Sequence, residues 1–270
     1  MTKSLYGLKQ ASRQWFDKLS TFLISDNYVQ SKFDHSLFIK KTSTDFTALL
    51  VYVDDIVLTR NSMSEITHIK TLLHHQFQIK DLGELKYFLE FEVARSKKGI
   101  HLCQRKYALD ILEETGMLGS KPCSTPFLSN TNFLYKTENY LDNPSAYRRL
   151  IRKLFYLTNT RSDLCFTVNL LSQFMQEPTK HHYQALQHIL RYVKFSPSEG
   201  LFFAADSDIQ IKGFSDSDWV TCPNTRRSTS GYCTFLGSFL VSWKSKKQST
   251  ISRSSTEAKF HALAATVNEI

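Results

Sequence analysis

Two apolar runs meet at a pair of acidic residues in the segment Leu49-Leu50-Val51-Tyr52-Val53-Asp54-Asp55-Ile56-Val57-Leu58. The β-branched and aliphatic residues of these runs predict a buried β-hairpin with its turn at the acids. Removing two anions from water costs several kcal/mol each unless a cation compensates. A divalent metal ion is the usual compensation, and paired Mg²⁺ ions commonly serve phosphoryl transfer. The alternative is a solvated Asp-Asp turn in an ordinary hairpin.

Length and composition indicate a globular chain. It has 270 residues, of which 41% are hydrophobic and 22% are charged, enough for two or three compact units. No apolar run approaches the roughly 20 residues of a membrane span, and the first residues lack the apolar core of a signal peptide. The five cysteines are widely spaced and form no C-x-x-C pair. A reducing compartment without structural zinc is the simplest interpretation.

The chain is strongly basic. Its formal net charge is +9, and its pI is about 9.2. The basic residues cluster in Arg95–Lys98, Arg148–Lys153, Thr225–Arg227 and Lys244–Lys247. Such clusters suit a polyanionic partner, whose counterions are released on binding. Many basic proteins bind no nucleic acid, so charge alone does not decide the partner.

The first region, residues 1–103, mixes helix and strand patterns. Apolar spacing predicts a helix over Ala11–Ile24, and the capping box Ser62–Glu65 predicts the start of another. Alternation at Tyr87, Leu89, Phe91 and Val93 predicts one strand. A turn at residues 97–99 leads to its partner strand, Ile100–Gln104. Helices and hairpins on one sheet predict an α+β palm.

The second region, residues 104–196, has helical periodicity. The predicted helices are Pro144–Leu157, Ser162–Gln176, and a third from Pro178 to Val193. Their polar faces carry a basic set, Arg148, Arg149, Arg152 and Lys153, together with His181 and His182. We predict that these basic residues contact a nucleic-acid backbone and that the histidines lie at the surface or face nucleic acid. The alternative for the basic set is a solvated charged face.

The third region, residues 200–270, returns to strand patterns. Leu201–Ala205 and Ile209–Phe214 flank Asp206-Ser207-Asp208, which predicts a hairpin. A helix is predicted to begin near Ser254 and to continue to the end of the chain at Ile270. An unfinished helix at a terminus suggests that the chain is truncated.

Two acids of the third region are candidate metal ligands. Asp216 follows a predicted strand, and Glu257 lies in the first turn of the last helix. An Asp at a strand end can share a divalent cation with a helical Glu. Glu257 also completes a capping box with Ser254, and the residues alone favour this structural role. Asp218, beside Trp219, is predicted to be a turn residue.

These motifs together resemble the Pol polyprotein of copia-type long-terminal-repeat retrotransposons. Residues 5–15 look like its L-Y-G-L-K-Q-A-P-R-x-W block, and Tyr52-Val53-Asp54-Asp55 matches its polymerase catalytic hairpin. Residues 81–89 resemble the start of its primer grip. Further similar blocks occur at 154–161 in its thumb, and at 215–219, 227–232 and 254–258 in its ribonuclease H segment. The match spans essentially the whole chain in the family's order.

The resemblance implies an RNA-directed DNA polymerase coupled to a ribonuclease H. Asp54 and Asp55 would bind catalytic Mg²⁺ (or Mn²⁺), and Asp216 and Glu257 would bind metal for cleavage of an RNA·DNA hybrid. In this view Glu257 is a metal ligand as well as a cap. Tyr6, Gly7 and Lys9 would line the nucleotide and template pocket, and Tyr52 would pack beneath the primer end. The implied partners are an RNA template, an RNA·DNA hybrid and deoxynucleoside triphosphates, without a membrane and in the cytoplasm. The oligomeric state is undetermined.

The resemblance also implies that both metal sites are incomplete. The family's other essential Asp residues would lie upstream of residue 5 and downstream of Ile270. We therefore expect a partial palm lacking the fingers (1–103), a helical thumb-like bundle (104–196) and a truncated ribonuclease H-like domain (200–270). Ser12, Glu90 and Lys259 depart from the family's usual Pro, Gly and acid. The leading hypothesis is a reverse-transcriptase fragment that is inactive by itself.

Two other hypotheses are retained. One is a non-catalytic nucleic-acid-binding remnant that uses the basic helices. It predicts hybrid binding that weakens steeply with salt and survives Asp54→Asn. The other is a fragment that never folds stably, which predicts a broad, non-cooperative thermal transition.

Overall fold

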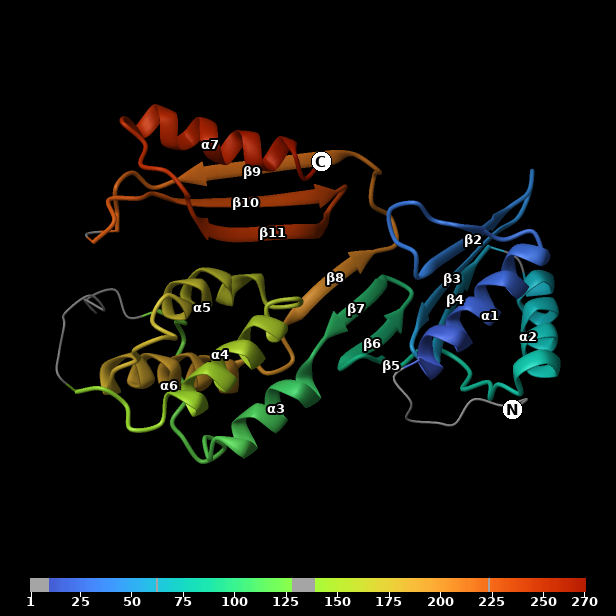
Figure 1. Cartoon of the computed structure of the whole chain (residues 1–270), viewed down its shortest axis with the longest axis horizontal. Helices are drawn as coiled ribbons and strands as arrows, with labels where there is room; N and C mark the ends of the chain where they lie inside the picture. Colours follow the sequence, from blue (N-terminus) through green and yellow to red (C-terminus); the bar gives the residue numbers. More distant parts are fainter. Residues whose placement is uncertain (1–9, 62, 128–138, 223) are drawn as a thin grey trace. The chain divides into compact units, whose positions relative to one another are not determined.

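The fold is mixed α and β. The computed structural model describes residues 10–61, 63–127, 139–222 and 224–270. Within these residues it contains three sheets and seven α-helices (Figure 1). They divide into two compact units, the first ending at Leu85 and the second comprising Lys86–Ile270. No helix among the described residues combines the length and the apolar composition of a membrane span.

The first unit is a four-stranded antiparallel sheet with two helices (Figure 1). Its strands follow the chain in the order β1 (Val29–Gln30), β2 (Leu37–Lys41), β3 (Phe46–Tyr52) and β4 (Asp55–Arg60). The helices are α1 (Ala11–Ser25) and α2 (Met63–Phe77). The predicted helix at 11–24 and the hairpin at the acids are therefore both present.

The core of the first unit lies between the helices and the sheet. Leu19 and Leu23 of α1 and Ile69 and Leu73 of α2 are completely buried, as is Leu49 of β3. The two α2 residues are four positions apart, so they lie on the same face of the helix. Ser62, the predicted cap of α2, lies outside the described residues.

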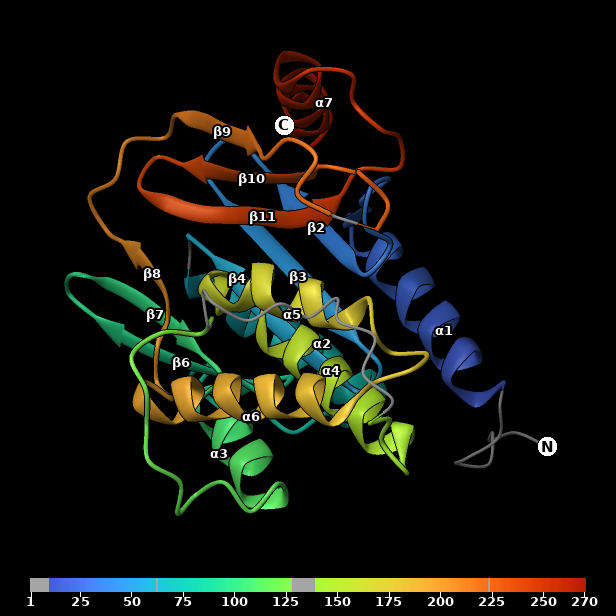
Figure 2. The same cartoon turned by 90° about the vertical axis from the view of Figure 1, so that its left-hand side faces the viewer.

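The second unit contains two sheets and five helices (Figures 1 and 2). One sheet has the order β5 (Tyr87–Phe88), β6 (Phe91–Ser96), β7 (Gly99–Cys103) and β8 (Gly200–Ala204). The other has the order β11 (Phe239–Lys247), β10 (Thr229–Leu236) and β9 (Ile211–Ser217). The helices are α3 (Arg105–Glu114), α4 (Pro144–Leu157), α5 (Cys165–Ser172), α6 (Lys180–Phe195) and α7 (Ser255–Val267).

Helices α3 to α6 share one apolar core. Helix α4 has the predicted bounds, because Pro144 occupies its first turn and the Asn143 side chain accepts a hydrogen bond from Ser145 N at 3.0 Å. The single helix predicted over Ser162–Gln176 is wrong. A 3₁₀ turn at Ser162–Leu164 precedes α5, which ends at Ser172.

Arg161 anchors this helical region from within. Its side chain is 1% exposed and pairs with Asp163 at 2.8 Å, while its Nη1 donates to Ser196 O at 2.8 Å. The guanidinium also lies over the Tyr192 ring, 5.2 Å from its centroid. A buried cation with this set of partners fixes the turn after α4 against the end of α6.

His182 corrects a surface prediction. It is 4% exposed, its Nδ1 accepts from Thr179 N at 3.0 Å, and its ring stacks on Phe174. Thr179 in turn caps His182 N, so the pair forms a capping box at the start of α6. The sequence pattern missed this role because a histidine rather than Glu or Gln completes the box.

The hairpin predicted over residues 201–214 is wrong. Strand β8 pairs with β7, in the register Gly99↔Ala204, whereas β9 pairs with β10 in the other sheet. The segment between them is held at Ser207 by the β10–β11 turn, where Ser238 N donates to Ser207 Oγ at 2.7 Å. The turn residues thus predicted correctly that a strand ends here and another follows, but not which strands these two pair with.

The strand predicted through Leu89 is interrupted. Phe88 pairs with Phe91, so Leu89 and Glu90 form a two-residue turn in which both have positive φ, 48° and 65°. The last helix also differs from its prediction, because α7 ends at Val267 and Asn268 is its C-cap.

Candidate functional site

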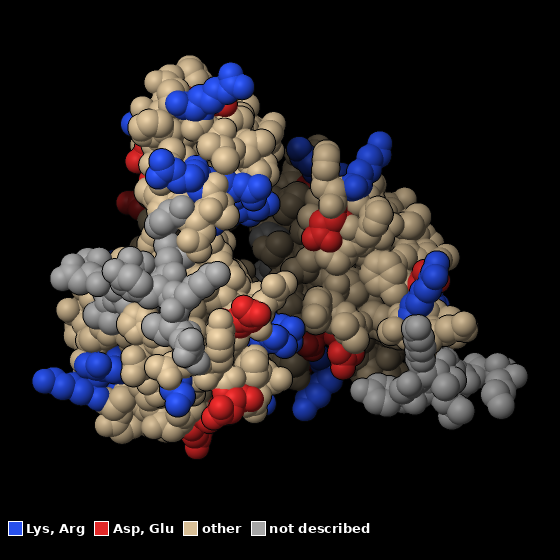
Figure 3. All heavy atoms as spheres, turned by 60° about the vertical axis from the view of Figure 1, so that its left-hand side comes forward, with Lys and Arg blue, Asp and Glu red and all other residues tan. Residues whose placement is uncertain are grey.

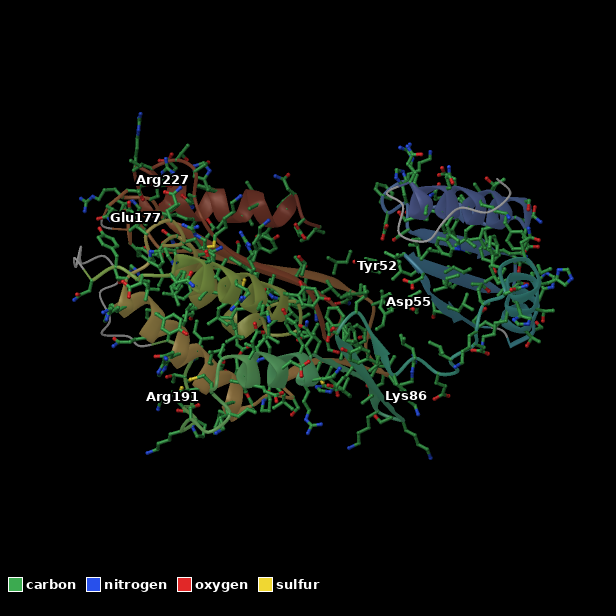
Figure 4. The ribbon with its side chains drawn as sticks, turned by 60° about the horizontal axis from the view of Figure 1, so that its bottom comes forward. Tyr52, Asp55, Lys86, Glu177, Arg191 and Arg227 are labelled. Atoms are coloured by element: carbon green, nitrogen blue, oxygen red, sulfur yellow. The ribbon has the colours of Figure 1, made fainter. Side chains whose placement is uncertain are left out.

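Asp54 and Asp55 lie at the tip of the β3–β4 hairpin. Tyr52 pairs with Asp55, which leaves Val53 and Asp54 as a two-residue turn. Figure 4 shows Tyr52 and Asp55 close together at this end of the hairpin. Both acids are exposed, and Tyr52 is half-exposed. The hairpin therefore presents two carboxylates and a phenol ring at one exposed tip.

The turn itself has an unusual backbone. Val53 has φ of 51°, a left-handed conformation that a β-branched side chain rarely adopts. Strained residues of this kind occur often at functional sites. Among the described residues, the hydrogen bonds and ion pairs use neither the Asp54 nor the Asp55 carboxylate. Their oxygens are hard ligands of the kind Mg²⁺ prefers, but two carboxylates fill only part of its octahedral shell.

Asp216 and Glu257 come from neighbouring elements of the second unit. Asp216 belongs to β9, and its partner across the sheet is Gly231, which brings no side chain against it. Its carboxylate is 82% exposed and lies 3.8 Å from Lys259 Nζ of α7. Glu257 lies one turn into the same helix. The fold thus places both predicted acids where β9 and the start of α7 pack together.

Glu257 has a structural role at the start of α7, although its side chain accepts from the residue before the predicted N-cap partner, Ser254. Its N–H donates to Ser254 Oγ at 3.1 Å, and its Oε2 accepts from Arg253 N at 2.7 Å. Its Oε1 lies 3.8 Å from His261 Nε2. Asp218 likewise has a structural role, because its Oδ1 accepts from Thr229 N. These acids are held by the protein itself, unlike those of the hairpin.

Gln248 joins the elements that carry Asp216 and Glu257. Its Nε2 donates to Ser217 Oγ of β9 at 3.1 Å, Ser230 Oγ of β10 at 2.8 Å and Ala258 O of α7 at 2.9 Å. Its Oε1 accepts from Ser252 Oγ at 2.7 Å. One amide therefore fixes the start of α7 against two strands. Sequence reasoning missed this residue, because its role depends on pairing between distant elements.

The other end of α7 is anchored by Glu269. Its carboxylate accepts hydrogen bonds from Ser242 Oγ at 2.7 Å and from Tyr232 OH at 2.9 Å. These bonds hold the pKa of Glu269 below its usual value. Within the described ranges, no group of three His, Cys, Asp or Glu side chains is placed to share a metal ion. Each candidate pair therefore needs further ligands to complete a metal shell.

Comparison with known proteins identifies the family. The family model described as "Reverse transcriptase (RNA-dependent DNA polymerase)" matches residues 1–129. The whole chain is 39% identical to the retrovirus-related Pol polyprotein from transposon RE2 of Arabidopsis thaliana, of which it covers 18%. It is 33% identical, over its whole length, to the corresponding polyprotein from transposon TNT 1-94 of Nicotiana tabacum, of which it covers 21%. An uncharacterized mitochondrial protein of Arabidopsis thaliana is 44% identical over 82% of the chain and 92% of its own length.

The chain belongs to the copia-type Pol family. It contains sequence of that family's reverse transcriptase domain. It spans about a fifth of the first two relatives. No solved structure matches it.

Three of the four basic residues predicted to bind nucleic acid make contacts within the chain. Arg148 donates to Met175 O at 2.6 Å and to Gln176 O at 3.1 Å. Arg149 lies 3.6 Å from Glu114, and Lys153 also pairs with Glu114. Arg152 is exposed. On the face in Figure 3, Lys and Arg side chains form separate small groups.

The departure from the family pattern at Glu90 falls in a turn that favours glycine. With φ of 65°, Glu90 has a conformation that costs an L-residue roughly 1–2 kcal/mol. Its carboxylate accepts a hydrogen bond from Tyr87 OH, and Leu89 O accepts one from Tyr156 OH of α4 at 2.6 Å. Two blocks that resemble the family, 81–89 and 154–161, therefore meet through the Tyr156 hydroxyl. Tyr6, Gly7 and Lys9 lie outside the described residues.

Proposed function

We propose that the chain is part of the polymerase of a copia-type Pol polyprotein and that Asp54 and Asp55 are metal ligands at its polymerase site. The observation that carries this proposal is the hairpin tip, where two exposed carboxylates outside the described hydrogen bonds and ion pairs flank a strained turn. Tyr52 contributes a half-exposed ring at the same tip, suited to packing beneath a primer end. A two-residue hairpin turn places its first residue at positive φ in any case, and here that residue is a valine, for which this conformation is strained.

Bound Mg²⁺ or Mn²⁺ would supply activation of a primer hydroxyl and neutralisation of charge on the leaving phosphates. The protein's contribution would be to orient the two carboxylates by the rigid β3–β4 pairing. Apolar burial of Leu49 and Val51 behind them holds the strand that carries the tip. The substrates proposed for this site are an RNA template with its primer and deoxynucleoside triphosphates.

We further propose that residues 200–270 are part of a ribonuclease H-like domain acting on an RNA·DNA hybrid. Asp216 and Glu257 would be its metal ligands, supported by their placement at the junction of β9 and α7. In the same proposal, residues 1–103 are part of the palm and residues 104–196 form the thumb. Because Glu257 accepts a hydrogen bond from Arg253 N and Asp216 lies beside Lys259, we expect metal binding at this second pair to be weaker than at the hairpin.

We propose that these 270 residues are inactive alone, because each described pair lacks the further carboxylate that the family resemblance implies for its site. Purified chain should extend an RNA-templated primer no faster than its Asp54→Asn variant, with either Mg²⁺ or Mn²⁺. Hybrid cleavage should likewise equal that of Asp216→Asn. If the purified chain extends the primer and Asp54→Asn abolishes this activity, the chain is not inactive alone, but the role of Asp54 at the polymerase site is supported.

A chimaera tests the site itself. These 270 residues would replace the aligned segment of the transposon RE2 Pol polyprotein, to which they are 39% identical. We expect primer extension that Asp54→Asn abolishes and that Asp45→Asn, a partly exposed acid in the turn between β2 and β3, leaves unchanged. Equal activity of the Asp54→Asn chimaera would refute the metal-ligand role.

A further inference from the structure

Cys222 and Lys247 form a close pair away from the candidate metal sites. Cys222 lies in the segment between β9 and β10, close in sequence to Arg227, which Figure 4 labels. Lys247 is the last residue of β11. The Lys247 Nζ lies 2.6 Å from Cys222 Sγ. A nucleophilic thiol and an amine are thus brought together from positions that the sequence separates.

Both partners are held in place by other contacts. Arg226 N donates to Cys222 O at 2.7 Å, and Cys222 N donates to Arg227 O at 3.3 Å, which fixes the backbone around the thiol. Lys247 Nζ also donates to Gln173 Oε1 at 3.0 Å. Both side chains are partly exposed, so a small oxidant can reach the pair without opening the fold.

The surroundings favour the reactive form of this thiol. Burial alone would raise the pKa of Cys222, but hydrogen bonds from Lys247 and Thr225 and the charge of Lys247 outweigh it and lower the pKa to about 7. Cys103 and Cys165 show the opposite effect, because burial raises the pKa of both thiols. Thiolates react with peroxides, whereas thiols react slowly.

We propose that Cys222 and Lys247 are a modification site, at which hydrogen peroxide joins Sγ to Nζ through one bridging oxygen atom. The two atoms are in direct hydrogen-bond contact, so a single oxygen atom can join them through small side-chain adjustments. The bridge would tie the segment before β10 to the end of β11. Gln248, the next residue, carries the amide that fixes the start of α7.

The chemistry requires two molecules of peroxide. The thiolate takes an oxygen from the first peroxide, giving a sulfenic acid and hydroxide, and the hydroxide removes a proton from the Lys247 ammonium. The free amine takes an oxygen from the second peroxide, giving a hydroxylamine and water. The hydroxylamine oxygen then bonds to the sulfenic sulfur, and the sulfenic oxygen leaves as water. Sulfur and nitrogen are oxidised, and both peroxides are reduced.

The test is peptide mapping of the whole chain after treatment with hydrogen peroxide. We expect the peptides containing Cys222 and Lys247 to appear joined, with a mass increased by one oxygen and decreased by two hydrogens. Dithiothreitol should return both peptides to their unmodified masses. Cys222 oxidised to an acid beside an unmodified Lys247, a direct sulfur–nitrogen bond, or no reaction at all would each overturn the proposal.

Matched variants separate bridging from simple thiol oxidation. Lys247→Arg keeps a cation beside the sulfur but should abolish the joined peptide, as should Cys222→Ser. Lys246→Arg, one residue earlier in β11, and Cys123→Ser, whose sulfur lies beside His188, should leave it unchanged. Loss of the joined peptide in either control would contradict this assignment. Peptide mapping of the unsubstituted chain tests the bridge even if a variant fails to fold.

Discussion

The two candidate metal sites differ in how far the protein itself occupies their carboxylates. At the β3–β4 tip, neither acid enters a described hydrogen bond or ion pair, and the backbone is strained at Val53. At the β9–α7 junction, Glu257 caps a helix, Asp216 lies beside Lys259, and hydrogen bonds fix both ends of α7. The carboxylates at the β3–β4 tip are therefore more available to bind a metal ion than those at the β9–α7 junction.

The largest expected effect is a loss of folding stability when Gln248, which holds the β9–α7 junction together, is replaced. Gln248→Leu would leave Ser217, Ser230 and Ala258 O without their shared donor, at a cost of about 1–3 kcal/mol. Urea unfolding followed by fluorescence would measure the loss. Gln210→Leu, an exposed position before β9, is the control and should change stability little. Equal stability of Gln248→Leu would mean that the amide does not hold α7.

The helix cap of the second site should come next in size. Ser254→Ala removes the oxygen that accepts from Glu257 N and should cost about 1 kcal/mol. Amide hydrogen exchange should then accelerate in the first turn of α7. Ser249→Ala, in the exposed connection before it, should have no such effect. If amide exchange in α7 does not change, the Ser254 cap does not stabilise the start of this helix.

The strain of the first site should be measurable as a gain in stability. Val53→Gly places a glycine where φ is 51° and should stabilise the hairpin by about 0.5–1 kcal/mol. Thermal unfolding of the chain would report it. Val57→Gly, in the regular strand β4, should be destabilising instead. A loss of stability in both variants would show that the turn is not strained.

The smallest effect concerns the cation beside Asp216. Lys259→Gln removes a surface ion pair worth under about 1 kcal/mol. Mn²⁺ binding, followed by electron paramagnetic resonance, should strengthen by a few fold at most. Lys180→Gln makes the same charge change at the start of α6 and should not affect it. Matching responses of the two variants would indicate a general charge effect.

Local patterns predicted the elements well where the determining contacts are local. Pro144 and the apolar period gave the bounds of α4, and the β-branched runs gave the hairpin at Asp54. They failed where pairing partners are distant. The turn signal at Asp206-Ser207-Asp208 contains nothing that directs β8 to β7, about a hundred residues earlier.

The sequence pointed to the candidate acids, whose role as metal ligands stays a prediction, but it did not indicate their surroundings. The four carboxylates are readable as motifs, and the cap by Ser254 follows from sequence spacing. Gln248 gave no such signal, because its three acceptors come from separate elements. The sequence also did not indicate that Arg148 binds within the protein, because its acceptors are backbone carbonyls in the segment after α5.

The pairing of β7 with β8 has a consequence for synthesis of the protein. Residues 104–199 emerge from the ribosome after β7 and before its partner strand. At about 5–20 residues per second, the β7 edge waits roughly 5–20 s for β8. An unpaired strand edge can recruit another nascent chain during that interval. Translation speed across α3 to α6 therefore sets how long newly made copies are exposed to mispairing.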